Sequence, residues 1–444
     1  MNKNDHFTGT CTGYTYDGLG VVKTDTFSVF VKDMIIGETG EIVVTAVRKG
    51  YGYGRLLNLI EESPQRIEPK CPVSRQCGGC QFQHMSLKGQ AFFKKSHVKE
   101  CINKIGRLNV EVKDVLTMEE PFRYRNKVQL PVGTDKNGQP VIGFYRYNSH
   151  DIIPVEDCWL QSEHSNAVVN KIRELMIRFN NVSSFRHIML RDFSSTEQCM
   201  VVLVTYKRNV PLLTEMVEEL VSSDSRIKSV IQNINGEDTN VVLGKRQKLL
   251  YGSWYIQDEL CGLKFEISSS SFYQVNSRQT EVLYSTAVDL LNLKGHELVM
   301  DLYCGVGTIG LIASKKAGKV LGVEIVESAI EDAKRNAALN NIDNVEFFCG
   351  DTGDIINKFK KEKIKPDAVI VDPPRKGCSK ETIDTLIELK PKKIVYVSCN
   401  PSTLARDLNL LREDYAVKTI QPVDMFSQSY HIETVVLLER IGQN

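Results

Sequence analysis

Short apolar runs in the C-terminal part of this chain stop abruptly at polar residues. Residues 394–397 (Ile-Val-Tyr-Val) end at Ser398, Cys399, Asn400 and Pro401. A β-branched run that ends in this way is typical of a central strand in a parallel sheet, whose carboxyl end places a side chain at the sheet edge. Ligands of open α/β sheets bind at that edge. The side chain placed there is the thiol of Cys399, which is either a small buried hydrophobe or a nucleophile.

From residue 298 onward strands alternate with helices, which predicts a doubly wound α/β domain. A glycine loop, residues 305–310 (Gly-Val-Gly-Thr-Ile-Gly), matches the G-x-G-x-x-G pattern between a strand and a helix. The glycines let the backbone approach a ligand closely, and Glu324 after the second strand suits a ribose. Both NAD and S-adenosylmethionine satisfy these features. We expect strands at residues 298–302, 320–323, 345–348, 368–371, 394–397 and 435–438.

Two acidic residues favour S-adenosylmethionine over NAD. Asp301 directly precedes the glycine loop, where a carboxylate attracts a positive sulfonium and amino group and repels a pyrophosphate. Asp372 ends the fourth strand and is followed by Pro373, Pro374 and Arg375, which would form a stiff wall beside a methyl acceptor. The sequence therefore favours a methyltransferase.

Cys399 indicates which atom receives the methyl group. An oxygen or nitrogen acceptor needs no thiol, whereas C5 of a pyrimidine becomes nucleophilic only after a thiolate adds to C6. The C5 proton must then leave, which requires a general base near the same edge. His431 and Glu433 precede the last strand, and chemistry alone does not choose between them.

Residues 1–61 have the pattern of a small OB-like β-barrel, in which short strands alternate with glycine turns. The hairpin at residues 48–55 (Arg-Lys-Gly-Tyr-Gly-Tyr-Gly-Arg) interleaves basic and aromatic side chains. Its tyrosines either stack on nucleic-acid bases or cap the barrel. Because the net charge is only +1, a nucleic-acid surface must be a local patch.

A central α+β domain is expected over residues 70–270, and a catalytic domain over residues 271–444. The central part begins with Cys71, Cys77 and Cys80, a spacing that indicates a metal centre in a reducing compartment. A fourth ligand is required, and Cys101 and Cys158 are the nearest candidates. The spacing itself does not separate zinc from an iron–sulfur cluster.

The central region also carries basic side chains. Residues 86–107 are expected to form a helix whose charges are almost all positive. At strand spacing Arg123, Arg125 and Lys127 share one face, which would hold RNA. Amphipathic helices at residues 162–179 and 211–222 are interpreted as scaffold.

The chain resembles, over essentially its whole length, the RNA uracil-C5 methyltransferase family, and most closely its bacterial 23S ribosomal RNA members. Ser398-Cys399-Asn400-Pro401 matches the family's nucleophile motif, and residues 431–434 (His-Ile-Glu-Thr) match its base motif. The resemblance implies that Cys399 is the nucleophile and Glu433 the base. It also implies a TRAM-type RNA-binding barrel and a [4Fe–4S] cluster held by Cys71, Cys77, Cys80 and Cys158. Residues matching the family's S-adenosylmethionine site are Gln274, Tyr303, Glu324, Asp351 and Asp372.

The leading hypothesis is an S-adenosylmethionine-dependent enzyme that forms 5-methyluridine in 23S ribosomal RNA, at one or two sites. The transfer-RNA branch of the family typically lacks the barrel and the cysteine cluster, which favours ribosomal RNA. One alternative is a transfer-RNA methyltransferase, and another is a non-catalytic RNA-binding iron–sulfur protein. No apolar run reaches the length of a membrane span and no signal peptide is evident, so we expect a cytoplasmic protein. RNA is the expected partner, with no membrane and no obligate protein partner.

Overall fold

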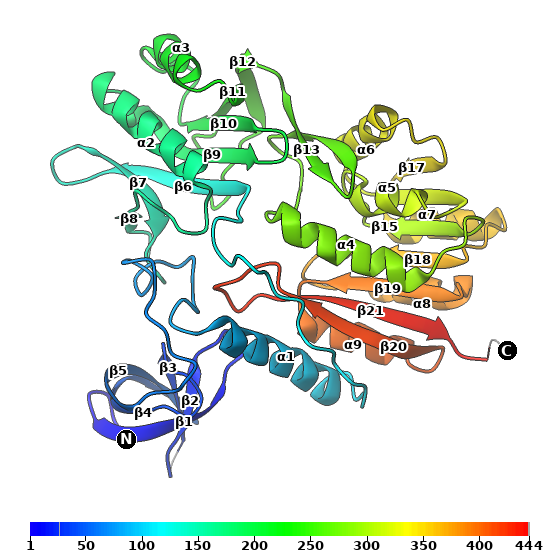
Figure 1. Ribbon diagram of the computed structural model, residues 1–444, viewed down its shortest axis with the longest axis horizontal. Coiled ribbons are helices and arrows are strands. Elements are labelled where there is room, and N and C mark those ends of the chain that lie inside the picture. The colour runs from blue at the N-terminus through cyan, green and yellow to red at the C-terminus, as the bar shows by residue number, and fades with distance from the viewer. Residues whose placement is uncertain (26, 443–444) are drawn as a thin grey trace.

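The computed structural model describes residues 1–25 and 27–442. The chain forms an N-terminal barrel, a central α+β region and a C-terminal α/β sheet with helices on both faces (Figure 1). This arrangement agrees with the fold class expected from the sequence. Among the described residues, no helix combines the length and the apolar character needed to cross a membrane.

The N-terminal barrel is closed by five strands in the order β1-β2-β3-β5-β4. Its core contains Cys11, Val22, Val29, Val31 and Ile42, which come from alternate positions of the strands. The strands are β1 (His6–Tyr14), β2 (Gly20–Lys23), β3 (Ser28–Lys32), β4 (Thr39–Arg48) and β5 (Tyr51–Glu61).

The turn between β1 and β2 packs against the segment that follows the cysteines. Gly18 has a φ of +85°, and a Cβ atom at this position would lie 2.5 Å from the Phe82 ring. Buried Glu38 in addition accepts a 2.7 Å hydrogen bond from Nη2 of Arg66 in the linker. The barrel is therefore fixed to the rest of the chain.

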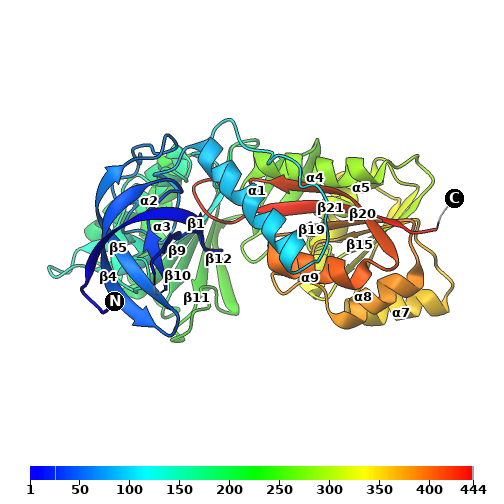
Figure 2. The same cartoon turned by 90° about the horizontal axis from the view of Figure 1, so that it is seen from below.

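Helix α1 (Leu87–Lys104) packs on the C-terminal sheet rather than on the central one. Figures 1 and 2 both show it alongside β20 and β21. Val98 and Ile102 belong to the same apolar core as Ile420 and Val436, and Val112 after the helix pairs with Ile420. The sequence-based division placed this segment in the central domain; in the structure α1 contacts the catalytic sheet, and its Phe93 also packs on Tyr14 and Phe82.

The central region contains a seven-stranded sheet in the order β12-β11-β10-β9-β6-β7-β8, in which only β10 and β11 pair in parallel. Its helices are α2 (Glu163–Arg178), which Ser162 caps, and α3 (Leu213–Ser223), close to the expected ranges. A short 3-10 turn (Val182–Ser184) precedes β9. The strands are β6 (Lys127–Thr134), β7 (Pro140–Tyr145), β8 (Ile152–Pro154), β9 (Phe185–Phe193), β10 (Gln198–Thr205), β11 (Ile227–Ile234) and β12 (Arg246–Gly252).

A hairpin of β13 (Tyr255–Leu260) and β14 (Leu263–Ser268) leads into α4 (Ser277–Leu291) and the C-terminal sheet. The sheet has the order β17-β16-β15-β18-β19-β21-β20, and β21 runs antiparallel to both its neighbours. The strand order reverses between β15 and β18, which is where ligands bind in such sheets. The strands are β15 (Leu298–Leu302), β16 (Lys319–Glu324), β17 (Val345–Cys349), β18 (Ala368–Val371), β19 (Lys393–Ser398), β20 (Tyr415–Val423) and β21 (Glu433–Arg440); the helices are α5 (Thr308–Ser314), α6 (Glu327–Leu339), α7 (Thr352–Lys361), α8 (Lys380–Leu389) and α9 (Pro401–Leu411).

Candidate active site

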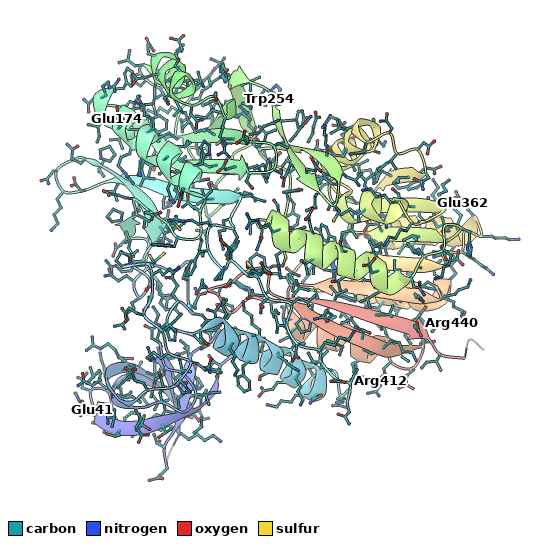
Figure 3. The ribbon with its side chains drawn as sticks, in the orientation of Figure 1. Glu41, Glu174, Trp254, Glu362, Arg412 and Arg440 are labelled. Carbon is teal, nitrogen blue, oxygen red and sulfur yellow. The ribbon has the colours of Figure 1, made fainter. Side chains whose placement is uncertain are left out.

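The carboxyl ends of the parallel strands open into one cavity of about 650 Å³. Glu362 and Arg440, in contrast, lie on the side of the C-terminal domain that is away from the central region (Figure 3). The cavity contains all seven residues that the sequence assigned to the cofactor and to catalysis. They are Gln274, Tyr303, Glu324, Asp351, Asp372, Cys399 and Glu433.

Asp301 supports the backbone of the glycine loop through a hydrogen bond. Its Oδ2 atom accepts a 2.8 Å hydrogen bond from the Gly310 amide, and its Oδ1 atom is buried without a partner. Burial, together with the nearby Asp372 and Glu324 carboxyls, raises the pKa of Asp301 to about 8. Asp301 does not line the cavity. The expectation that it faces the ligand is therefore wrong, because the backbone of the loop uses this carboxyl instead.

Three cavity residues have positions fixed by local hydrogen bonds. Glu324 at the end of β16 accepts from the amides of Gly305 (3.1 Å) and Val326 (3.0 Å). Tyr303 has a φ of +65°, and its hydroxyl lies 3.1 Å from Oγ1 of Thr382. Asp351 caps α7 by accepting from the Gly353 amide at 2.9 Å.

Strand pairing brings Cys399 and Glu433 together. Ser398, the last residue of β19, pairs with Thr434 of β21. Cys399 directly follows Ser398 and Glu433 directly precedes Thr434, so both lie next to this pair. Asp372 enters from the end of β18, the neighbour of β19 on the other side. Three segments far apart in the sequence therefore meet at one point.

The charges at this point oppose ionisation. Burial, and then the nearby carboxyls of Glu433 and Asp372, raise the pKa of Cys399 to about 11, while Arg375 acts in the opposite direction. Burial also raises the pKa of Asp372 to about 7 and the pKa of Glu433 well above its ordinary value. Burial and mutual repulsion thus oppose ionisation of these three side chains, and a cation bound beside them would favour their ionised forms.

His431, the rival base, lies beside the rings of Tyr430 and Phe426, with centroids 4.3 and 6.0 Å away. Burial, together with nearby cations that include Arg375, lowers its pKa to about 4. His431 is therefore a neutral imidazole at pH 7.

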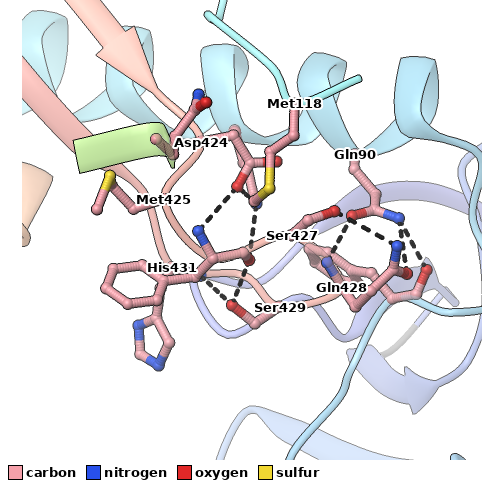
Figure 4. Close-up of polar contacts among 12 residues, drawn as sticks. Gln90, Met118, Asp424, Met425, Ser427, Gln428, Ser429 and His431 are labelled. Atoms are coloured by element: carbon pink, nitrogen blue, oxygen red, sulfur yellow. Dashed lines mark hydrogen bonds and ion pairs between the residues drawn. The ribbon is translucent and has the colours of Figure 1, made fainter. Parts of the chain in front are cut away.

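The loop at residues 424–432, which delivers His431 and Glu433, is fixed by α1 (Figure 4). Lys94 is fully buried and its Nζ donates to Oδ1 of Asp424 at 2.6 Å and to the Phe426 carbonyl at 3.2 Å. The Gln428 amide donates to Oε1 of Gln90 at 2.9 Å. Lys94 of the basic helix expected from the sequence therefore binds the catalytic loop and is not exposed to solvent.

Arg375, which the sequence placed in the wall that follows Asp372, lines the cavity. Other cavity residues were not assigned from the sequence. Tyr284 and Phe272 carried no signal for a site, because Tyr284 reads as an ordinary apolar position of α4 and Phe272 lies in a loop. Thr308, in the glycine loop, also lines the cavity.

The four cysteines assigned to a cluster line a second, smaller cavity. Cys71, Cys77 and Cys80 come from the loop before α1, and Cys158 from the loop after β8. Cys101 is elsewhere: it lies on α1, with its sulfur 3.5 Å from Oγ of Ser402 on α9. Of the two candidate fourth ligands, only Cys158 is close to the other three.

Arg123, Arg125 and Lys127 do not form the shared RNA-binding face that the sequence predicted. Strand β6 begins only at Lys127, and Arg123 has a φ of +56°, so the three residues do not alternate along one strand. Arg123 is bound to Asp157, with Nη2 2.9 Å from Oδ2, and Arg125 lines the cysteine cavity. Burial lowers the pKa of Lys127 to about 8. Arg123 and Arg125 pack near the cysteines instead of sharing one face with Lys127, as strand alternation had predicted.

The barrel hairpin does present its aromatic rings at the surface. Tyr51 stacks on Phe30 with centroids 5.4 Å apart, Tyr53 meets both rings edge-on, and none of the three belongs to the barrel core. Such rings are available for base stacking.

A third polar cluster lies between α2 and the central sheet. Nδ1 of His164 and Nη2 of Arg226 each lie 2.9 Å from Oδ1 of Asp192, and Nε2 of the same imidazole bonds to Asp224. Burial lowers the pKa of His164, but the two carboxyls outweigh it and raise the pKa overall. These contacts connect α2 to β9.

Comparison with known proteins indicates which family this chain belongs to. The model of the tRNA (uracil-5-)-methyltransferase family matches residues 90–441. A Clostridium tetani protein named as an uncharacterized RNA methyltransferase is 46% identical over 451 residues, covering 100% of this chain and 98% of its own. A Listeria innocua protein with the same description is 45% identical over 447 residues, covering 99% and 98%.

One solved structure is similar over nearly the whole chain. The tRNA (uracil-54, C5)-methyltransferase of Pyrococcus abyssi, in complex with S-adenosyl-L-homocysteine, matches with a TM-score of 0.78 and 29% identity. The match covers 97% of this chain and 100% of that one. We expected the transfer-RNA branch to lack the N-terminal barrel and the cysteine cluster, but an enzyme named for transfer RNA matches over 97% of this chain, so the barrel does not by itself favour ribosomal RNA.

Proposed function

This chain belongs to the tRNA (uracil-5-)-methyltransferase family, and we propose that it methylates C5 of uridine in 23S ribosomal RNA through a covalent bond from Cys399 to C6. Activity as an S-adenosylmethionine-dependent RNA uracil-5-methyltransferase follows from the family. The observation that carries the residue assignment is the meeting of Cys399, Asp372 and Glu433 in one cavity at the strand ends.

The thiolate of Cys399 adds to C6, and the electron pair of the C5–C6 double bond moves to C5, which becomes nucleophilic. Bound S-adenosylmethionine supplies an electrophilic methyl group to that carbon. Glu433 then accepts the C5 proton, the double bond re-forms, and Cys399 leaves C6 as a thiolate. Arg375 lowers the pKa of both Cys399 and Glu433 and so favours the ionised form that each needs.

The residues of the larger cavity fit S-adenosylmethionine. Glu324 and Asp351 are carboxylates at neighbouring strand ends, suited to hydroxyl and amino groups, and Tyr303 adds an aromatic wall. We assign Asp372 to the side nearer the reacting carbon, because, beyond the effect of burial, its carboxyl raises the pKa of both Cys399 and Glu433. We assign Gln274 to the same side, because it lies with Asp372 and Glu433 around the Tyr284 hydroxyl.

We propose further that Cys71, Cys77, Cys80 and Cys158 hold a [4Fe–4S] cluster. A tetrahedral zinc ion, with Zn–S bonds of about 2.3 Å, would bring four sulfurs to about 3.8 Å from one another. Within the described part of the chain, no three of these sulfurs lie within 4.8 Å of one another. The wider spacing favours a cluster, which would cross-link the loop before α1 to the loop after β8.

The RNA target has two candidates. The motifs and the cysteine quartet support 23S ribosomal RNA, and the end-to-end match with the Pyrococcus abyssi enzyme supports transfer RNA. Mass-spectrometric mapping of 5-methyluridine in both RNAs, with and without this protein, separates them. Loss of the modification from transfer RNA alone would overturn the ribosomal assignment.

The covalent mechanism is tested with Cys399→Ala. This variant should lose methyl transfer and the RNA adduct on a denaturing gel, while it still binds S-adenosylmethionine. Cys349→Ala, at an exposed thiol of the same domain, is the matched control and should keep full activity. Methylation by Cys399→Ala would refute the covalent mechanism, whereas a wild-type protein that binds RNA and methylates none would favour a role in RNA binding alone.

A further inference from the structure

A second cavity, of about 170 Å³, adjoins the active site on the side of the barrel. Arg375, Cys399 and His431 line both cavities, so the two share a wall. The remaining wall combines three parts of the chain that are distant in sequence: the β1–β2 turn, α1 and the catalytic loop. Their side chains are Tyr16, His97 and Tyr430.

The chemistry of this wall suits a nucleotide. Tyr16 is 73% exposed, and Tyr430 lies across the opening beside His431. Aromatic faces stack on any base, and each stacked base contributes substantially to the binding of single-stranded RNA. Among the described residues, the exposed Arg375 side chain has no carboxylate within ion-pair distance, so it is available for a phosphate.

The β1–β2 turn is held by hydrogen bonds and packing. Oγ1 of Thr15 accepts from the Leu19 amide at 2.9 Å, and Gly18 packs against Phe82. At the start of the turn, the Tyr14 hydroxyl oxygen accepts from the Ile36 amide at 3.1 Å. A turn fixed in this way limits the backbone entropy that is lost when Tyr16 binds a base.

A single exposed tyrosine needs no explanation. Here, however, two aromatic rings from separate parts of the fold and an unpaired guanidinium converge on a cavity that contains the nucleophile. We propose that this cavity is a subsite for the nucleotide next to the target uridine: its base stacks on Tyr16 and Tyr430, and Arg375 binds the phosphate between the two nucleotides. The proposal rests on the proposed function and adds the barrel to the walls of the active site.

The test uses the full-length enzyme and short single-stranded RNAs that contain the target uridine. One RNA has all its bases, and two others have an abasic nucleotide on the 5′ or the 3′ side of the uridine. With the wild type, one of the two abasic RNAs should lose about 5- to 100-fold in kcat/KM. Tyr16→Ala should show a similar loss with the intact RNA and little further loss with that abasic RNA.

Control variants distinguish a loss of base stacking from a loss of folding. Tyr16→Phe should restore most of the activity, because it keeps the ring. Tyr251→Ala, at a tyrosine on β12 that is 44% exposed, should behave as the wild type. The KM for S-adenosylmethionine should not change in any of these variants. Arg375→Gln should lower the slope of log Kd against log salt by about 0.7, the value for one phosphate of a single strand.

Two results would overturn the subsite. One is a Tyr16→Ala variant with unchanged kcat/KM on the intact RNA. The other is a loss that is the same on intact and abasic RNA, which would mean that the ring does not contact the neighbouring base. Failure of the proposed function is distinguishable, because the wild type would then methylate none of the RNAs.

Discussion

The buried ion pair between Lys94 and Asp424 makes a quantitative prediction. Lys94 is 0% exposed and Asp424 is 2% exposed, and their side chains are joined at 2.6 Å. Lys94→Met removes the ammonium and leaves a buried carboxylate without a charged partner. Removing one member of a buried pair costs about 3–5 kcal/mol. Because Asp424 begins the loop that delivers Glu433, the same change should also lower kcat.

The double variant Lys94→Met/Asp424→Asn separates charge from packing. It removes both charges, and the asparagine oxygen can still accept from the Phe426 amide, as Asp424 does at 3.1 Å. Replacing a whole buried pair by neutral groups is often close to neutral in stability. The double variant should therefore recover most of the free energy that the single variant loses.

The assay is hydrogen exchange of α1 and of residues 424–440, which reports the local free energy of opening even in a protein of several domains. A loss of 3–5 kcal/mol corresponds to exchange about 150- to 5,000-fold faster at 25 °C. In Lys94→Met, protonation of the buried Asp424 carboxylate would remove the uncompensated charge. The loss of stability in Lys94→Met should then become smaller as the pH falls and larger as the pH rises. A change below about 1 kcal/mol, or a double variant as unstable as the single one, would refute the reasoning.

Three further predictions concern the site. Glu433→Gln should form the covalent RNA adduct and trap it, because the C5 proton has no acceptor; Glu439→Gln on the same strand is the control, and normal turnover would remove Glu433 from its role. S-adenosylmethionine should bind more tightly as the pH rises from 6 to 7.5, with release of protons, because a cation favours ionisation of Asp372, which lines the cavity and has a pKa of about 7. Calorimetry in buffers of different ionisation enthalpy measures this, and binding without proton release would contradict it. Cys158→Ser should lose iron from anaerobically purified protein, whereas Cys101→Ser should retain it; one equivalent of zinc and no iron in the unmodified protein would rule out the cluster.

Local patterns in the sequence were enough to predict the catalytic domain. Strand and helix periodicities, the glycine loop and the polar residues that end each strand depend on neighbours a few positions away. In a parallel sheet all strand ends meet at one edge, so the sequence alone could place Cys399, Asp372 and Glu324 near one another. The strands of residues 298–302 and 368–371 have the expected bounds.

The misjudged residues are those whose roles depend on contacts with distant segments. Lys94 looked like part of a solvated basic face, and only the packing of α1 on β20 and β21 buries it beside Asp424. Asp301 supports the glycine loop because the Gly310 amide points at it, which no spacing reveals. Likewise, Arg123 is committed to Asp157 by a left-handed backbone turn.

The sequence by itself determined the strand-end chemistry: a thiol, several carboxyls and a glycine loop at one edge of a sheet. Only the tertiary structure decided that Cys158 rather than Cys101 lies with the other three cysteines, and that Tyr16 of the barrel lies beside Cys399. The physical reason is that periodicity encodes which side of an element is buried, whereas the identity of the segment that buries it follows from how whole elements pack.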